Sequence, residues 1–233
     1  MTCVSCSTFQ VLKVRLQSCS SYSNCSSCVA SGDPYCGWCT LENKCVLKEE
    51  CTFVGDKQQH GFLISAGLES DQCPRVESVE PANVSLHDTS STVKQVHLTL
   101  NFIPPPAFGD QYQCVFLHAH VAAEFLPPNK LLCQLPKPEQ RPRITINRDF
   151  VTVPLKVWSS RSQRAILQTT FTFYDCSFHK LCTACVQSRW HCDWCLEDSL
   201  CVRDSGTCSN QVRISHNDQL WLVPKQLHDN NDD

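Results

Sequence analysis

The sequence lacks any long apolar run. No stretch of about 18 consecutive apolar residues occurs among its 233 residues, so the sequence predicts no membrane span. The N-terminal residues, Met1 to Cys6, are not followed by the apolar segment of a signal peptide, so none is predicted.

A strong charge of either sign is also lacking. The formal net charge is −3 and the pI is about 6.3, whereas nucleic-acid binding requires a basic field. We therefore expect no nucleic-acid partner. Arg141, Arg143 and Arg148 form a modest basic run beside a proline-rich turn, which is typical of a solvated loop; contact with heparan is the remote alternative.

Catalytic motifs are missing as well. Ser, His and Asp residues do not occur in a nucleophile-elbow or triad context, and neither a phosphate loop nor a paired-carboxylate signature is present. His118 and His120 would share one face of a strand, but no carboxylate or third ligand accompanies them, which favours a surface pair over a metal site. The sequence predicts no enzyme, no metal and no cofactor.

The sequence does contain 19 cysteines, and they are unevenly spread. Eight lie from Cys19 to Cys73 and seven from Cys176 to Cys208, with only Cys114 and Cys133 between the two groups. This pattern predicts three domains. Because domains of about 50 residues bury too little apolar surface without cross-links, we expect disulfides and an oxidising compartment. Since no signal peptide is predicted, we interpret the chain as a fragment or truncated product of a longer one.

The two cysteine-rich ends repeat one another. Seven cysteines are separated by 5, 2, 7, 2, 5 and 5 residues in the first copy, and by 5, 2, 6, 2, 5 and 6 in the second. Other residues also match: Tyr35–Cys39 with His191–Cys195, Leu41-Glu42 with Leu196-Glu197, and Cys45-Val46 with Cys201-Val202. The second copy has no counterpart of Cys73, so we interpret it as incomplete.

The middle of the chain alternates between apolar and polar residues. Val96, Leu98, Leu100 and Phe102 alternate with polar residues, and residues 151–157 and 170–174 behave likewise, with proline-rich turns between them. Such runs predict an antiparallel β-sandwich. Cys114 and Cys133 could form a disulfide between two of its strands. Closing a loop of this size stabilises the folded domain by roughly 3 kcal/mol. The predicted fold class is therefore mainly β, with small disulfide-rich domains on either side of an antiparallel β-sandwich.

The C-x-x-C pairs admit two other interpretations. Cys36-Gly37-Trp38-Cys39 could be a redox pair, but no βαβ pattern surrounds it, which favours a structural role. Zinc is the other alternative, but the spacers are short and the cysteines at Cys45 and Cys51 repeat, which a four-ligand site does not require. We expect Trp38 and Trp194 to pack against disulfides.

Three strings in the first copy resemble the PSI domain of plexins, semaphorins and integrins: Asn24–Cys28, Gly32–Cys39, and the pair Cys45 and Cys51. With the following sandwich and the second copy, the chain resembles a plexin ectodomain. The resemblance implies a remnant of a sema propeller (residues 1–18), a first PSI domain (19–73, copy 1), an immunoglobulin-like IPT/TIG domain (74–175, the sandwich), a truncated second PSI domain (176–223, copy 2) and a disordered tail (224–233).

The resemblance also implies a disulfide pairing, which the residues alone leave open because eight cysteines allow 105 connectivities. The implied pairs are Cys19–Cys36, Cys25–Cys73, Cys28–Cys45, Cys39–Cys51, Cys114–Cys133, Cys176–Cys192, Cys185–Cys201 and Cys195–Cys208. Cys182 matches the position whose partner is the missing eighth cysteine. Cys3 and Cys6 match no family pattern, so these three cysteines are candidates for unpaired thiols.

The resemblance implies a rigid stalk of a semaphorin receptor on the extracellular side of the plasma membrane. The expected partners are a semaphorin, bound through the sema domain that this chain lacks, other plexin domains, and the receptor itself. Alternatives are a decoy that pairs with full-length receptor through Cys182, Cys3 or Cys6, and a zinc-binding module. Asn24 and Asn83 lie in N-glycosylation sequons; we favour Asn83, at the expected start of a loop, because Cys25 would be disulfide-bonded.

Overall fold

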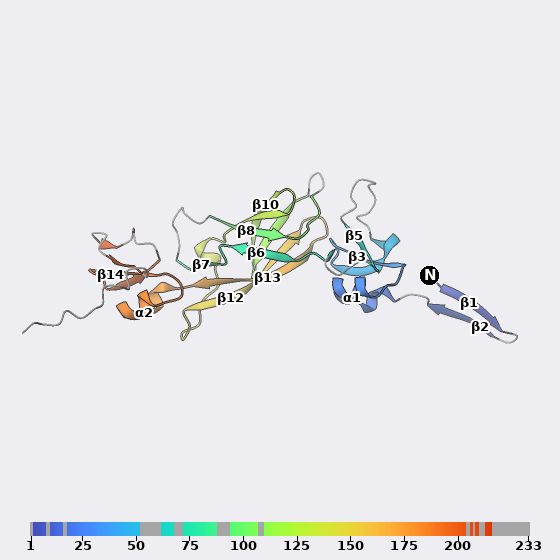
Figure 1. Cartoon of the computed structure of the whole chain (residues 1–233), viewed down its shortest axis with the longest axis horizontal. Coiled ribbons are helices and arrows are strands. Elements are labelled where there is room, and N and C mark those ends of the chain that lie inside the picture. The colour runs from blue at the N-terminus through green and yellow to red at the C-terminus, as the bar shows by residue number, and fades with distance from the viewer. Residues whose placement is uncertain are drawn as a thin grey trace, which may run out of the picture. The chain divides into compact units, whose positions relative to one another are not determined.

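The computed structural model describes residues 2–7, 10–15, 18–51, 62–67, 72–87, 94–106, 110–203, 206, 208–209 and 213–215, with the backbone alone in the first two ranges. The described part is mainly β (Figure 1). Strands β1 (Thr2–Ser7) and β2 (Gln10–Arg15) form an antiparallel hairpin. The predicted tail, residues 224–233, lies outside the described residues.

Copy 1 folds around a short helix and three strands. Its elements are η1 (Cys19–Ser21), α1 (Cys25–Ala30), β3 (Cys36–Cys39), β4 (Lys44–Leu47), η2 (Lys48–Glu50) and β5 (Leu63–Ser65). The strand order is β4-β3-β5, which places Trp38 opposite Cys45 on one side and Ile64 on the other.

Copy 2 repeats this arrangement. Its elements are η5 (Cys176–Phe178), α2 (Cys182–Val186), β14 (Asp193–Cys195), β15 (Leu200–Val202) and β16 (Arg213–Ile214). The order β15-β14-β16 places Trp194 between Cys201 and Ile214. The two copies of the cysteine repeat therefore have the same small fold.

The hairpins of the two copies correct one part of the sequence alignment. Asn43 and Ser199 each lie four residues after the preceding cysteine, and both have a positive φ, of 51°. When the two copies are aligned on these residues, Leu41 of copy 1 is equivalent to Glu197 of copy 2. The alignment of Leu41-Glu42 with Leu196-Glu197 is therefore wrong by one residue.

Eight strands form the sandwich. They are β6 (Val76–Glu80), β7 (Asn83–Ser85), β8 (Gln95–Leu100), β9 (Tyr112–Phe116), β10 (Ala119–Leu126), β11 (Lys130–Gln134), β12 (Phe150–Ser159) and β13 (Arg164–Tyr174), with η4 (Pro138–Gln140) in the proline-rich segment. The order is β6-β8-β11-β10-β9-β12-β13-β7. Strand β7 runs parallel to β13, whereas the neighbouring pairs from β6 to β12 in the strand order are antiparallel.

Period-2 alternation explains the core of the sandwich. In β8, Val96, Leu98 and Leu100 are fully buried, because alternate side chains point to the same face. In β12, Val153, Leu155 and Val157 are buried in the same way. Phe102, which the alternation included, lies after the end of β8 and is half-buried.

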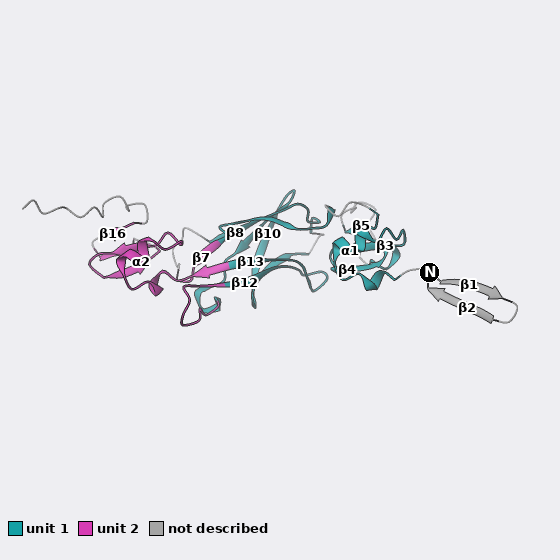
Figure 2. Ribbon diagram, turned by 60° about the horizontal axis from the view of Figure 1, so that its bottom comes forward, with its two compact units in different colours: residues 1–82, 94–141, 152–171 teal, residues 83–93, 142–151, 172–233 magenta. Residues whose placement is uncertain are grey.

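The chain divides into two compact units (Figure 2). Unit 1 contains residues 1–82, 94–141 and 152–171, and unit 2 contains residues 83–93, 142–151 and 172–233. Copy 1 thus lies in unit 1 with most of the sandwich, and copy 2 lies in unit 2 with the ends of sandwich strands. The division runs through β12 and β13 and does not follow the predicted domain bounds, so those bounds stay predictions.

Candidate functional site at the domain junctions

Eight disulfides stabilise the three regions, four within copy 1, one within the sandwich and three within copy 2. They join Cys19–Cys36, Cys25–Cys73, Cys28–Cys45, Cys39–Cys51, Cys114–Cys133, Cys176–Cys192, Cys185–Cys201 and Cys195–Cys208. The structure brings together the same pairs that the family resemblance implies. Their Cα atoms are 5.3 to 5.9 Å apart, the usual separation for a disulfide.

The disulfides and one tryptophan form the small core of each copy. Trp38 is 4% exposed and packs with Cys28, Cys36 and Cys45. Trp194 is 8% exposed and occupies the equivalent place in copy 2. Each tryptophan therefore supplies apolar contact area that so short a chain segment could not otherwise bury.

Cys182 has no disulfide partner among the described cysteine side chains, and its side chain is partly exposed. It is the first residue of α2, as Cys25 is of α1. The side chains of Cys3 and Cys6 lie outside the described residues. Two groups of residues approach at metal-ligand distance, namely Cys39 with Glu42 and Cys51, and Cys176 with Cys192 and Cys201. Their sulfur atoms are in disulfides, so they offer no thiolates.

The two sequon asparagines lie in different settings. Asn24 is exposed and caps α1, because its side-chain oxygen accepts a hydrogen bond from the Ser27 N–H at 2.8 Å. Asn83 is exposed as well, but it lies in strand β7, paired with Thr172, so the expected loop at this position is wrong.

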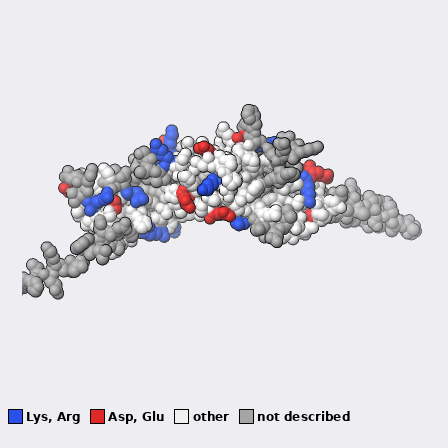
Figure 3. Space-filling view, turned by 45° about the horizontal axis from the view of Figure 1, so that its top comes forward, with Lys and Arg blue, Asp and Glu red and all other residues white. Residues whose placement is uncertain are grey.

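The other candidate residues do not form a site with one another. His118 and His120 are both exposed, and His120 contacts the Gln113 side chain at 3.1 Å. In the basic run, Arg143 and Arg148 are exposed, while the Arg141 side chain donates to the Pro136 carbonyl at 3.1 Å. On the face shown in Figure 3, acidic and basic side chains are scattered among neutral ones.

The path of the chain from copy 1 into the sandwich is fixed by Asn101. Its Nδ2 donates to the Cys73 carbonyl at 3.0 Å, and its Oδ1 accepts from the Arg75 N–H at 2.7 Å. A further backbone bond joins the Asn101 N–H to the Arg75 carbonyl at 3.2 Å. One side chain therefore holds both residues that flank Pro74.

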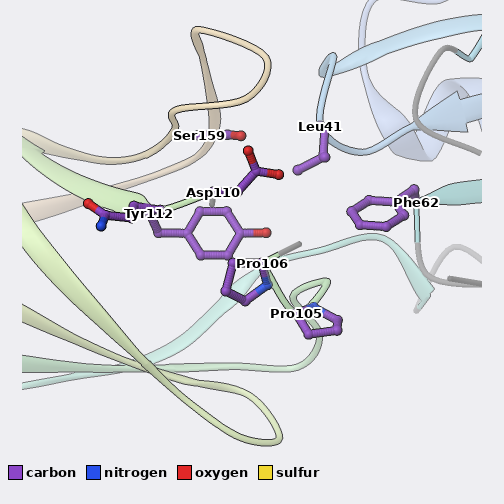
Figure 4. Close-up of a pocket in the computed structure, with 8 residues that line it drawn as sticks. Leu41, Phe62, Pro105, Pro106, Asp110, Tyr112 and Ser159 are labelled. Atoms are coloured by element: carbon purple, nitrogen blue, oxygen red, sulfur yellow. The ribbon is translucent and has the colours of Figure 1, made fainter. Parts of the chain in front are cut away.

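Side chains of copy 1 also pack against the sandwich within unit 1. Leu41 and Phe62 are 3% and 1% exposed, and they face Tyr112, Pro105 and Pro106 (Figure 4). The cavity left among the lining residues is about 10 Å³, room for about one water molecule. This first junction is therefore closely packed.

Two side chains form hydrogen bonds to backbone carbonyls at the edges of the first junction. The Asn43 Nδ2 at the hairpin tip donates to the Ala165 carbonyl at 3.1 Å. Tyr112 is buried and donates its hydroxyl to the Pro104 carbonyl at 2.7 Å. Burial, and secondarily the nearby charge of Asp110, raises the pKa of Tyr112 well above its ordinary value.

Within unit 2, Trp190 of copy 2 forms a second junction with the first residue of β12, Phe150, and the last residue of β13, Tyr174. Its ring stacks on Tyr174, with centroids 4.9 Å apart and planes 2° apart. Phe150 contacts the same ring at 5.6 Å. The Arg189 guanidinium lies 4.3 Å from both the Phe150 and Trp190 centroids, a distance suited to cation–π attraction.

Asp149 anchors this aromatic cluster. Its Oδ2 accepts from the Trp190 indole N–H at 2.7 Å and lies 3.5 Å from the His179 Nε2. Its carbonyl accepts from the Asp175 N–H at 2.8 Å, and the Asp175 side chain caps η5 through the Ser177 N–H at 2.9 Å. Asp149 and Asp175 thus bind the start of copy 2 to the sandwich.

A further polar contact closes copy 2 near its last disulfide. The Ser209 hydroxyl and N–H donate to the Asp198 carboxylate at 2.6 and 2.7 Å. These hydrogen bonds, first the side-chain one, lower the pKa of Asp198. They tie the β14–β15 hairpin to the residue that follows Cys208.

Sequence reasoning missed both Asn101 and Trp190. Asn101 carries no motif, and its partners lie far away in the chain. Trp190 did carry a signal, because it stands two residues before Cys192, where copy 1 has Pro34. A large aromatic residue that breaks an otherwise close repeat predicts a contact that only one copy makes.

Family comparisons match all three regions. The family model described as "Plexin repeat" matches residues 18–74, that described as "TIG domain" matches residues 80–174, and that described as "Plexin A/B, PSI domain" matches residues 182–208. Among the described residues, no helix has the length and apolar character needed to cross a membrane.

Similar proteins cover nearly the whole chain. It is 32% identical to plexin-A2 of Mus musculus over 220 residues, which is 93% of this chain and 11% of the relative. It is 34% identical to plexin-A4 of Homo sapiens over 203 residues, 87% of this chain and 10% of the relative. A solved structure of the full extracellular region of plexin A4 matches with a TM-score of 0.69 and 32% identity, over 91% of this chain and 22% of that one. The chain thus spans about a tenth of the length of these curated relatives.

Proposed function

Because this chain belongs to the plexin family, we propose that it is an extracellular spacer segment of a plexin-type semaphorin receptor. In this role it sets the distance and angle between the ligand-binding part of the receptor and the part nearer the membrane. The proposal assigns no catalysis to the segment. Semaphorin binding is assigned to a sema domain elsewhere in the parent receptor.

The observation that carries the proposal is the way in which each PSI copy is joined to sandwich strands within its own unit. Cys73 and the first residue of β6, Val76, are separated by only two residues, and Asn101 holds both sides of that link. Strand β13 ends at Tyr174 and η5 begins at Cys176, with Trp190 stacked on Tyr174. Short links with packed side chains restrict rotation, whereas free linkers permit domain motion.

Backbone ¹⁵N relaxation of the complete chain tests this proposal. If each copy tumbles together with the sandwich, amides in copy 1, the sandwich and copy 2 give the same rotational correlation time. Trp190→Ala is expected to shorten the correlation time of copy 2 alone, and Asn101→Ala that of copy 1 alone.

Leu181→Ala is a matched control, because it removes an exposed apolar side chain from copy 2 without touching the junction. It is expected to leave all correlation times unchanged. A copy that already tumbles faster than the sandwich in the unmodified chain contradicts the spacer proposal.

Ligand binding offers a separate test. We expect no measurable semaphorin affinity for the isolated chain, because the proposal places that contact outside it. Titration with a semaphorin by surface plasmon resonance checks this expectation. Sub-micromolar binding assigns ligand recognition to this segment and overturns that part of the proposal.

A second candidate function is favoured by the free, partly exposed thiol of Cys182. A soluble form of the chain could pair with full-length receptor through this cysteine, or through Cys3 or Cys6, and act as a decoy. A larger species on non-reducing gels, lost on reduction and in Cys182→Ser, supports this function. A monomer under both conditions contradicts it.

A further inference from the structure

Residues of copy 1 and of β13 line an open groove beside Asn24. Its volume is about 390 Å³. The lining residues come from the start of α1, the Cys25–Cys73 disulfide, Trp38, Asn43 and the first half of β13. All of them belong to unit 1.

The groove is lined by neutral side chains. Hydroxyl and amide groups come from Ser23, Asn43 and Gln168, and apolar surface comes from Leu167 and Pro74. A charged ligand would find no counter-charge among the lining residues, and a purely apolar one would cover the Ser23 hydroxyl and the Gln168 amide without bonding to them. A neutral sugar, with hydroxyl and acetamido groups on an apolar ring, matches this mixture.

The geometry of Asn24 presents an attachment point at the edge of the groove. The Oδ1 of Asn24 accepts from the Ser27 N–H, and an N–H can bond only to the oxygen of the amide, so the orientation of this amide is fixed. Its Nδ2 is therefore not used by the cap. Since Asn24 is exposed and Ser26 completes the sequon, this nitrogen is available for modification.

We propose that Asn24 carries an N-linked glycan and that its innermost N-acetylglucosamine lies in this groove, between copy 1 and the sandwich. In the transfer step, a C–N bond forms between Asn24 Nδ2 and the sugar C1 of a lipid-diphosphate-linked oligosaccharide. The bond from C1 to the diphosphate oxygen breaks, the lipid diphosphate leaves, and the amide proton passes to a base of the transferase.

The disulfide at the middle residue of the sequon does not prevent this step. Cys25 pairs with Cys73, which follows 48 residues later in the chain. Because synthesis proceeds from the N-terminus, the sequon can reach the transferase while Cys25 is still reduced. This removes the reason for which the sequence favoured Asn83 over Asn24.

Peptide mapping of the complete chain, secreted from animal cells, tests the attachment. Release with peptide N-glycosidase in ¹⁸O-water converts a glycosylated Asn24 into ¹⁸O-labelled Asp. We expect this label in the unmodified chain and its loss in Ser26→Ala, which breaks the sequon but keeps the Asn24 cap of α1. Recovery of unlabelled Asn24 from the secreted chain overturns the proposal.

The rate of enzymatic release tests the position of the sugar. We expect release from Asn24 to be several-fold slower in the folded chain than in the reduced and denatured chain. Leu167→Arg places a charged side chain in the groove and is expected to remove this protection while the glycan stays attached. Equal protection in the unmodified chain and in Leu167→Arg shows that the sugar lies outside the groove.

Discussion

The two PSI copies share one disulfide-bonded framework but contact the sandwich through different faces. Copy 1 uses its β3–β4 hairpin, with Leu41 and Asn43, and the nearby Phe62. Copy 2 uses the segment before β14, with Arg189 and Trp190. Because the disulfides and the central tryptophan form the core of each copy, the residues that contact the sandwich can differ between the copies. The comparison shows that the fold of a copy and its choice of contact face are encoded by separate residues.

The largest expected difference in stability between the two copies arises when the equivalent disulfide is removed from each. Cys28–Cys45 and Cys185–Cys201 are matched, because they close loops of 17 and 16 residues. Loss of either is expected to cost about 2–5 kcal/mol. Copy 1 keeps three other bridges and copy 2 keeps two, so we expect only copy 2 to unfold in the double alanine variants.

Hydrogen exchange followed by mass spectrometry measures protection in each copy separately. In the Cys185→Ala, Cys201→Ala variant, we expect copy 2 to exchange as an unfolded chain while copy 1 stays protected. In the Cys28→Ala, Cys45→Ala variant, we expect partial protection of copy 1. Equal loss of protection in the two variants shows that the number of bridges does not distinguish the copies.

The next largest effect concerns the contact face of copy 2. Trp190→Ala removes the stack on Tyr174 and the bond to Asp149, with an expected cost of about 3–5 kcal/mol to the second junction. Trp190→Phe keeps a stacked ring but removes the indole N–H that donates to Asp149, with an expected cost of about 1–3 kcal/mol. Pro34→Ala, at the equivalent but exposed position of copy 1, is expected to change stability by less than about 0.5 kcal/mol.

Hydrogen exchange of each copy at increasing denaturant concentration, followed by mass spectrometry, measures these differences without relying on the substituted Trp190 ring. The order Ala, Phe, then the unmodified chain is expected for increasing stability of copy 2. A cost for Pro34→Ala as large as that for Trp190→Ala would show that the two faces are equivalent after all.

A smaller effect is expected at the first junction for Tyr112→Phe. The buried hydroxyl donates to the Pro104 carbonyl, and its loss leaves that acceptor without this donor, at a cost of about 1–2 kcal/mol. Because the folded-state pKa of Tyr112 is raised, the folded chain favours the neutral phenol. The associated stability is complete below the unfolded pKa of about 10 and is lost as the pH rises above it.

Absorbance at 295 nm during alkaline titration follows this ionisation. In the unmodified chain, we expect Tyr112 to ionise only at a pH well above the ordinary tyrosine pKa of about 10, or on unfolding. Tyr112→Phe is expected to remove this late step. The same late step in Tyr112→Phe and in the unmodified chain contradicts the assignment to the buried Tyr112 hydroxyl.

The smallest expected effect concerns the helix caps. Asn24 caps α1 with its side chain, whereas Leu181, the equivalent residue before α2, makes no side-chain cap and is 68% exposed. We expect Leu181→Asn to stabilise copy 2 by about 0.5–1 kcal/mol. Leu181→Ala separates the cap from the loss of the apolar side chain, and thermal unfolding measures both. No gain of Leu181→Asn over Leu181→Ala shows that α2 does not depend on a cap.

Patterns within single segments of the sequence predicted the elements that depend on those segments alone. The alternation in residues 95–100 and 151–157 identified β8 and β12, and the repeated cysteine spacing identified two equivalent units. Strand β10 gave no such signal, because its side chains are only half-buried or exposed throughout. Strand β7 has three residues and pairs in parallel, which no local alternation reports.

The junctions depend on contacts between distant residues, which periodicity cannot report. The side chain of Asn101 reaches a carbonyl 28 residues away, and Trp190 reaches a carboxylate 41 residues away. Alternation tells which face of a strand is buried but not which segment buries it. The pairing of the cysteines was likewise open from the residues and entered only through the family resemblance.

The Cys25–Cys73 disulfide also determines how copy 1 responds to mechanical tension. A pull between Cys19 and Cys73 passes along the few residues from Cys19 to Cys25 and then across the disulfide. In copy 2, the Cys176–Cys192 and Cys195–Cys208 disulfides give a similarly short covalent route. The sandwich has one disulfide, which spans 19 residues and leaves most of its chain free to extend. Under force, the ends of this segment therefore keep their length until their disulfides are reduced, and the lengthening occurs in the sandwich.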